Sequence, residues 1–116
     1  MLNADFEVII LEQGKEVLNK LNISGGGRCN VTNVCIDPEQ IVKHDPRGNR
    51  ELLGPFHRFN TQDTVAWFEN QGVKLKAESD GRMFPVSDDS MDIVNCLIRL
   101  TKKYSIKVIT STKVIG

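Results

Sequence analysis

The sequence predicts an α/β fold, or an α+β arrangement if the chain holds only part of a domain. Two apolar, β-branched runs at residues 6–11 and 106–109 are typical of strands. Between them, residues 87–101 carry apolar side chains at helical spacing. At 116 residues the chain fits one domain or part of one, because single domains commonly have roughly 100–150 residues.

The first expected element is a buried strand over residues 6–11, which ends at Glu12 and is followed at once by a turn. A short helical turn is expected within residues 15–21. Residues 22–33 are so rich in Gly, Asn, Ser and Thr that we expect a loop there rather than regular structure.

Two short helices are expected next. Asp37 followed by Pro38 predicts a helix start, because Asp accepts hydrogen bonds at an N-cap and Pro suits the first helical position. Residues 49–59 have a helical pattern, although Pro55 interrupts it.

A clearer helix is expected from Thr61, as its cap, to Gly72, as its end. Residues 73–77 alternate apolar and charged side chains, which predicts a half-buried strand, and Asp80-Gly81 predicts a turn.

The helix that follows is expected to be capped by Ser87, and residues 106–109 to form a strand that Val114 and Ile115 extend or follow. The apolar face of this helix is expected to consist of Met91, Val94, Leu97, Ile98 and Thr101.

Composition excludes several classes of protein. Fifteen basic residues balance fifteen acidic ones, so no overall positive field favours nucleic acid as a partner. Three widely spaced cysteines favour a reducing compartment, and we expect a cytoplasmic protein. No apolar run approaches the roughly 20 residues that a membrane span needs, and no His or Cys pair has the spacing of a metal site.

Glu12 is the first candidate site residue. In dinucleotide-binding folds, an acidic residue at the end of a strand accepts hydrogen bonds from the adenosine ribose hydroxyls. The alternative is an ordinary strand whose terminus is solvated. The complete motif also has a Gly-x-Gly-x-x-Gly turn about 20 residues earlier, and only eleven residues precede Glu12. We therefore expect the chain to begin inside such a fold.

The second candidate is the run of three glycines that is followed by a cation. Glycines let a backbone approach a ligand and expose its N–H groups, and Arg28 adds a positive charge, so the segment suits an anionic ligand. A flexible surface loop is the alternative interpretation. The segment consists of Ser24, Gly25, Gly26, Gly27, Arg28, Cys29 and Asn30.

Residues 23–33, Ile-Ser-Gly-Gly-Gly-Arg-Cys-Asn-Val-Thr-Asn, resemble the signature of the BaiN-like NAD(P)/FAD-dependent flavoproteins. Further similar segments run in the family's order through nearly the whole chain. They are residues 8–14, 46–48, 53–56, 67–68, 72–73 and 80–87.

The resemblance implies a partial Rossmann-like FAD-binding domain over residues 1–116, with helical segments and part of an inserted region. It places Glu12, with Gln13 and Gly14, at the adenosine ribose of FAD. The glycine segment would lie beside the isoalloxazine and ribityl portion, and Val114 near adenine through its backbone. Residues 73–87 would lie near the flavin and substrate side.

The function implied is that of part of an FAD-dependent oxidoreductase that takes NAD(P)H as reductant and acts on a small molecule. Flavin would carry out the hydride or electron transfer while the protein binds and orients it. No general acid or base is identified, and Cys29 and Tyr104 are expected to serve packing.

Two alternatives remain open. In the first, the chain is a non-enzymatic remnant that associates with itself or with a partner through exposed strand edges. In the second, it is a phosphate or nucleotide binder that uses the glycine segment alone.

Overall fold

The computed structural model describes residues 6–116, so the first five residues of the expected domain lie outside the described part. Its elements in chain order are β1 (Ile9–Leu11), α1 (Asn19–Gly27), β2 (Thr32–Asn33), α2 (Pro38–Ile41), the 3-10 helix η1 (Val42–His44), α3 (Asn49–Arg58), α4 (Thr61–Asn70), β3 (Leu75–Ala77), β4 (Arg82–Pro85), α5 (Met91–Lys103) and β5 (Lys107–Ile109).

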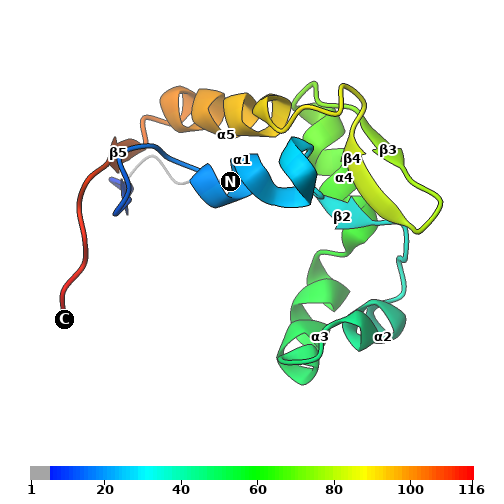
Figure 1. The fold of residues 1–116 in the computed structure, drawn as a ribbon. Helices are drawn as coiled ribbons and strands as arrows, with labels where there is room; N and C mark the ends of the chain where they lie inside the picture. The colour runs from blue at the N-terminus through cyan, green and yellow to red at the C-terminus, as the bar shows by residue number, and fades with distance from the viewer. Residues whose placement is uncertain (1–5) are drawn as a thin grey trace.

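The strands form two separate sheets. β1 and β5 pair in parallel, with Ile9 opposite Lys107 and Leu11 opposite Ile109. β2, β4 and β3 form an antiparallel sheet in that order. Figure 1 shows α1 and α5 running between the two sheets, with α2 and α3 projecting from the antiparallel end. The mixture of helices with a parallel strand pair confirms the α/β prediction.

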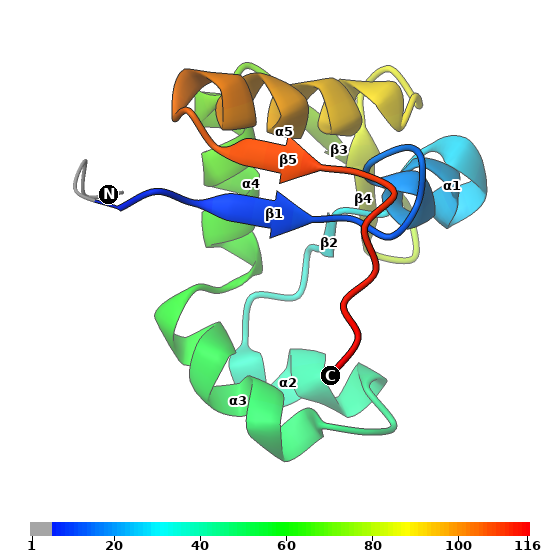
Figure 2. The same ribbon diagram turned by 90° about the vertical axis from the view of Figure 1, so that its left-hand side faces the viewer.

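The parallel sheet differs from expectation in its burial. All three residues of β1 are exposed, whereas the apolar run predicted a strand covered on both faces. The strand pair is packed on one face only, the face that lies toward α5, as Figure 2 shows. The partner of β1 is β5, which follows 95 residues later (residues 12–106 lie between them), so the local sequence around β1 does not show how the pair is covered.

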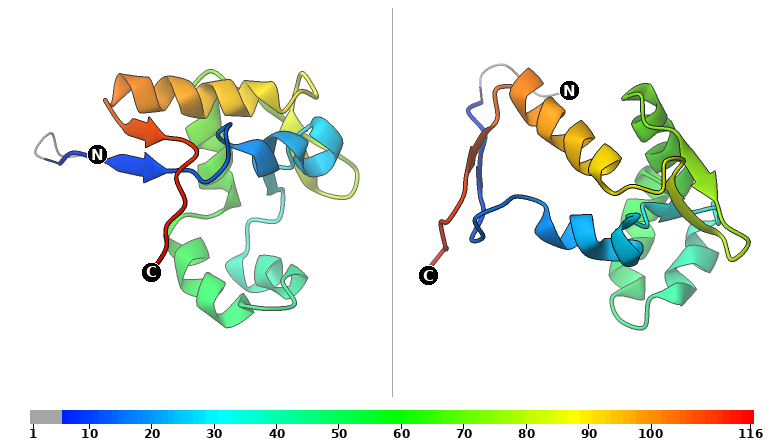
Figure 3. Two further views of the ribbon diagram at one scale, coloured as in Figure 1. Left: turned by 60° about the vertical axis from the view of Figure 1, so that its left-hand side comes forward. Right: turned by 45° about the horizontal axis from the view of Figure 1, so that its top comes forward.

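The core lies instead between α5, α4 and the segments beside the antiparallel sheet. Within the described chain, a contiguous group of buried side chains is formed by Cys29, Phe68, Val73, Ile93, Cys96 and Leu100. Phe84 and Pro85 of β4 are also fully buried. The right-hand view in Figure 3 shows this region at the opposite end of α5 from the parallel pair.

Helix α5 begins later and buries a different face than expected. It starts at Met91, and its N-cap is Ser90 rather than Ser87. Ser87 instead donates its hydroxyl hydrogen bond to Asp92, at 2.6 Å. The buried residues are Ile93, Val94, Cys96 and Leu100, because the core lies about one residue's rotation from the predicted face.

The N-cap of helix α4 lies one residue before the predicted cap, Thr61. Asn60 is the N-cap, and its side chain accepts from the Asp63 N–H at 2.9 Å while Asp63 accepts from the Asn60 N–H at 2.8 Å. This reciprocal pair is a capping box. Thr61 is buried and donates to the carbonyl of Cys35 at 2.7 Å, which ties α4 to the segment after β2.

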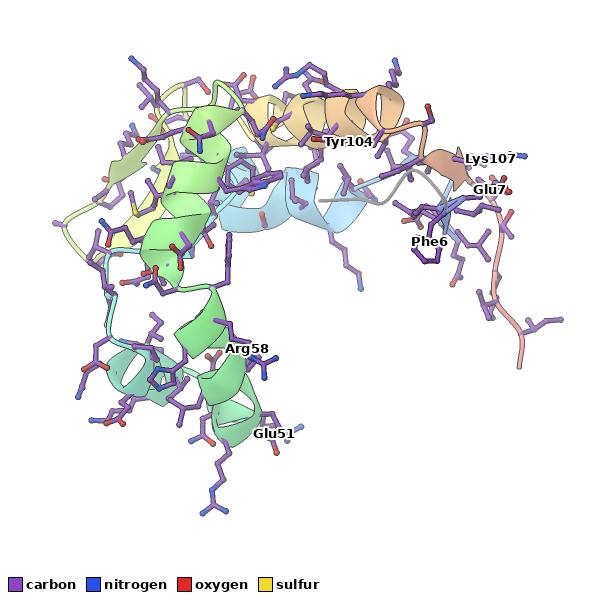
Figure 4. All side chains as sticks on the ribbon, turned by 180° about the vertical axis from the view of Figure 1, so that it is seen from behind. Phe6, Glu7, Glu51, Arg58, Tyr104 and Lys107 are labelled. Atoms are coloured by element: carbon purple, nitrogen blue, oxygen red, sulfur yellow. The ribbon has the colours of Figure 1, made fainter. Side chains whose placement is uncertain are left out.

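The predicted start of α2 and the course of α3 are confirmed. Asp37 accepts a hydrogen bond from the Glu39 N–H at 3.0 Å, and Pro38 is the first helical residue. Helix α3 runs through Pro55 and ends at Arg58. Figure 4 shows Glu51 and Arg58 on this projecting helix, away from the parallel strand pair.

The glycine-rich segment was expected to be a loop, and the structure places part of it in helix α1. The helix is kinked, because Ser24 is extended and Gly25 and Gly26 have φ angles of 57° and 68°. Glycine tolerates positive φ without the clash that a Cβ would cause. The segment is thus a helical turn interrupted by a glycine bend.

No helix within the described residues combines the length and the apolar character that crossing a membrane requires.

Candidate functional site

Glu12 lies at the carboxyl end of β1, and its side chain is held by the turn that follows. The Gly14 N–H donates to Oε1 of Glu12 at 2.6 Å. The same turn is attached to the segment after β5, because Thr112 donates its N–H to the carbonyl of Glu12 at 2.9 Å and Ser111 donates to that of Gly14 at 2.8 Å. The carboxylate therefore sits at the shared carboxyl end of two parallel strands.

An open groove of about 920 Å³ adjoins this turn and contains all three residues of the first predicted cluster. Its lining consists of Glu12, Gln13, Gly14, Lys15, Glu16, Leu18, Asn19, Lys20 and Leu21. A carboxylate in such a groove can accept hydrogen bonds from paired hydroxyl groups, and the two lysines add donors for an anion.

The glycine segment lies at the other end of α1. Its carbonyl at Gly27 accepts from the Ser90 N–H at 2.9 Å, and Cys29 donates its N–H to Ser24 at 3.0 Å. The lining of the groove ends at Leu21, so the groove stops short of this segment. The structure thus separates the two predicted clusters by the first turns of α1.

The three glycines have different surroundings. A Cβ at Gly25 would lie 2.9 Å from both the Asn30 nitrogen and a ring carbon of Phe84, so this position requires glycine for packing. A Cβ at Gly26 or Gly27 would meet no atom within 4 Å. Of the three glycines, only Gly26 and Gly27 therefore present backbone that a ligand can approach.

Arg28 is engaged by neighbouring side chains. Its Nη1 lies 2.6 Å from Oε1 of Glu78 and 3.3 Å from Oδ1 of Asp88, and its guanidinium carbon lies 3.9 Å from the ring centroid of Phe84. Lys76 joins the same network, because its Nζ lies 2.5 Å from Oδ2 of Asp88. The cation thus fastens the glycine segment to the β3–β4 hairpin and to the turn before α5.

The charges in this network reinforce one another. The hydrogen bond with Glu78 raises the pKa of Arg28 above its ordinary value, while the hydrogen bond from Lys76, followed by that from Arg28, lowers the pKa of Asp88. Sequence reasoning missed both acidic partners, because they lie 50 and 60 residues from Arg28 along the chain.

Cys29 is 4% exposed and belongs to the core, as the sequence predicted. Burial raises the pKa of its thiol, which leaves less of the reactive thiolate at neutral pH. Asn30 is exposed at the end of the segment. Val114 is 70% exposed in the strandless tail after β5, so the predicted strand extension is absent there.

A second cavity, of about 700 Å³, lies between α5 and the parallel pair and was not foreseen from the sequence. Trp67, Leu97, Thr101 and Tyr104 contribute to its wall, together with Ile10 and Glu12. Tyr104 was expected to be packed, but it is 50% exposed at this cavity. The signal in the sequence is the spacing of residues 97, 101 and 104, which lies on one helical face.

In the part of the chain that the structure describes, no three His, Cys, Asp or Glu side chains gather in a way that would hold a metal ion.

Comparison with known proteins shows partial similarity to three curated enzymes. The 3-dehydro-bile acid delta(4,6)-reductase of Clostridium scindens is 29% identical over 112 residues, which is 97% of this chain and 26% of that protein. The ribosomal RNA dihydrouridine synthase of Escherichia coli is 29% identical over 91 residues, or 78% and 22%. Its Haemophilus influenzae namesake is 26% identical over 107 residues, or 92% and 26%. The chain spans about a quarter of these relatives' length.

The family model described as the HI0933-like protein Rossmann domain matches residues 1–116. This match covers the whole chain and agrees with the parallel strand pair and with the resemblance seen in the glycine segment. The chain belongs to the HI0933-like Rossmann-domain family.

Proposed function

We propose that this chain is the adenosine-binding part of a flavin-dependent oxidoreductase, in which Glu12 accepts hydrogen bonds from the ribose hydroxyls of FAD. The observation that carries the proposal is the Glu12 carboxylate at the carboxyl end of a parallel strand, beside a groove of about 920 Å³. That is where Rossmann folds receive the ribose of a dinucleotide.

The residues fit one part of the cofactor better than the other. The groove supplies an acceptor for hydroxyl groups at Glu12 and cations at Lys15 and Lys20. Within the 116 residues no Gly-x-Gly-x-x-Gly turn is present to receive the pyrophosphate. FAD, when bound, would supply hydride or electron transfer. The chain's own part would be to hold the adenosine end.

The glycine segment contributes a rigid backbone rather than a free cation. Arg28 is committed to Glu78 and Asp88, so an approaching ligand would meet the open backbone at Gly26 and Gly27. We propose that this backbone lies beside the ribityl or ring portion of the flavin. In that arrangement α1 sets the separation between the two contacts.

The reductant and the substrate of the whole enzyme are further parts of this proposal. We propose NAD(P)H as the reductant and a small unsaturated molecule as the substrate, in a cytoplasmic enzyme. A reductase of bile-acid derivatives is among the similar proteins, which supports a small-molecule substrate. Two others are named for the synthesis of dihydrouridine in ribosomal RNA, so an RNA substrate is the competing proposal.

Titration with FAD, ADP and FMN, followed by flavin fluorescence or calorimetry, tests the adenosine contact. We expect FAD and ADP to bind and FMN to bind much more weakly, because FMN lacks adenosine. Glu12→Gln should weaken the binding of FAD and of ADP by about tenfold, because it removes a hydrogen bond to a charged group. Glu16→Gln, on the same groove, is the matched control and should bind as the unaltered chain does.

A second candidate function is a non-enzymatic, self-associating module. The exposed apolar residues of β1 favour it. Under this reading neither FAD nor ADP binds at any reachable concentration, and Glu12→Gln has no effect. Binding of ADP that depends on Gly26 and Gly27 but not on Glu12 would instead favour a phosphate binder.

A further inference from the structure

Four charged side chains from three separate parts of the chain meet beside the glycine segment. Arg28 directly follows α1, Lys76 and Glu78 lie on β3 or just after it, and Asp88 lies in the turn before α5. The two cations and the two anions of this group balance one another. Arg28 therefore has little positive charge to offer to an anionic ligand, and it serves as a link between elements.

The link depends on the shape of the guanidinium group of Arg28. One nitrogen, Nη1, reaches the carboxylates of both Glu78 and Asp88, while the flat group lies over the ring of Phe84. That ring is fully buried, so it is a fixed surface for the guanidinium group. Lysine carries the same charge but lacks the flat face and the fork of donors. These contacts therefore fix the side chain of residue 28 in a way that only arginine can satisfy.

The open backbone at Gly26 and Gly27 lies between two points that are fixed against the same ring. On one side Gly25 packs so closely on Phe84 that a Cβ would not fit, and on the other side Arg28 lies over that ring. Gly26 and Gly27 have φ angles of 68° and 88°. Glycines have wide conformational freedom when no neighbouring atoms restrict them. The contacts of Arg28 therefore limit the freedom of the two residues whose backbone is open.

The turn before α5 holds the segment at a second point. Ser90 in this turn donates its N–H to the carbonyl of Gly27 at 2.9 Å, and its buried hydroxyl donates to Oδ1 of Asn22 at 2.6 Å. Asp88, in the same turn, pairs with Arg28. The turn thus holds both the backbone and the arginine of the glycine segment.

We propose that Glu78 and Asp88 are positioning residues for the flavin end of the cofactor. Acting through Arg28, and without contacting the cofactor themselves, they fix the Gly26–Gly27 backbone beside which the ribityl or ring portion lies. This inference rests on the function proposed above. It adds the β3–β4 hairpin and the turn before α5 to the cofactor site, although neither lines the groove at Glu12.

Calorimetric titration of the 116-residue chain with FAD and with ADP tests the inference, because only FAD carries the flavin end. Glu78→Ala should raise the dissociation constant of FAD about three- to fivefold, the effect of a partly exposed ion pair, and leave that of ADP unchanged. Glu78→Gln keeps an acceptor oxygen and should recover part of the loss. Asp80→Asn is the matched control on the same hairpin, because Asp80 pairs with Arg82 and not with Arg28.

A double variant tests whether Arg28 transmits the effect. Arg28→Lys keeps the charge but loses the flat, forked contact, and it should weaken FAD binding about as much as Glu78→Ala does. The double variant should weaken it little further, because both changes act on one contact. Losses that add would mean that the two residues act independently, and they would contradict the inference.

The amide NMR signals of Gly26 and Gly27 in the ligand-free chain give a second measurement. They should move in Glu78→Ala and keep their positions in Asp80→Asn, with both variants unfolding cooperatively in urea. Unmoved glycine signals, or an unchanged ratio of FAD to ADP affinity in Glu78→Ala, overturn the inference and leave the Glu12 contact standing. A chain that binds neither FAD nor ADP overturns the proposed function, and the inference with it.

Discussion

Single residues in the glycine segment have roles that depend on their surroundings. Arg28 forms ion pairs with Glu78 and Asp88 and lies over the ring of Phe84. Cys29 is buried in the core. An arginine and a cysteine beside three glycines predicted a site for an anionic ligand. The structure shows that both side chains first hold the segment in place.

Cysteine reactivity should follow burial. Cys29 and Cys96 are buried, and burial raises the pKa of both thiols, whereas Cys35 is partly exposed. We expect a thiol reagent at neutral pH to modify Cys35 quickly and the other two only on unfolding. Colorimetric titration of thiols in the Cys35→Ser variant measures this. Rapid modification of Cys29 in the folded variant would show a more open core.

The ion network should make the hairpin sensitive to acid. Because the folded state lowers the pKa of Asp88, its contribution to stability is complete above the ordinary carboxyl value of about 3.9 and is lost as pH falls through the folded value. Asp88 has a φ of 58°, which Asn also tolerates, so Asp88→Asn removes the charge alone.

We expect the urea midpoint of Asp88→Asn to lie below that of the unaltered chain at pH 7, and the difference to shrink as the pH falls below about 4. The effect should be small, because the pair is accessible to solvent. A difference in midpoint that is independent of pH would mean that the carboxylate charge is not responsible. Asp63→Asn would not serve as a control, because the Asp63 carboxylate accepts a hydrogen bond in the capping box of α4.

At the scale of elements, the bend in α1 requires glycine at one position more than at the next. Gly25→Ala should destabilise the chain by about 2–4 kcal/mol, because positive φ costs roughly 1–2 kcal/mol and the Cβ would clash with Asn30 and Phe84. Gly26→Ala is the matched control and should cost only the φ term. Urea unfolding measures both, and equal losses would contradict the contact at Gly25.

Helix α4 depends on its capping box. Asn60→Ala should lower the free energy of unfolding by about 1 kcal/mol, because it leaves the Asp63 N–H without its acceptor. Asn60→Asp keeps an acceptor and should recover most of the loss. Urea unfolding of the two variants makes the comparison, and an Asp variant as unstable as the Ala variant would argue against capping.

At the scale of the whole molecule, stability should be uneven. The core lies around α5 and α4, whereas β1, at the other end, is exposed and pairs only with the half-buried β5 within the described residues. Hydrogen exchange of the 116-residue chain should therefore be slow at residues 93–100 and fast at residues 9–11. Uniform protection along the chain would contradict this division.

Local patterns in the sequence determined several features directly. Asp37-Pro38 started α2, the 106–109 run became β5, and Glu12 ended its strand, because caps, turns and β-branched runs act over a few residues. The family was also evident from the order of the glycine segment and its flanking motifs.

Only the tertiary structure decided which apolar surfaces were covered. It left β1 exposed, turned the buried face of α5 to Ile93 and Cys96, and paired Arg28 with two carboxylates more than 49 residues away. The spacing of apolar residues along the sequence indicates that a side chain can be buried, but it does not indicate which other residues will contact it. Burial depends on contacts between segments distant in the chain, and those form only when the whole fold is assembled.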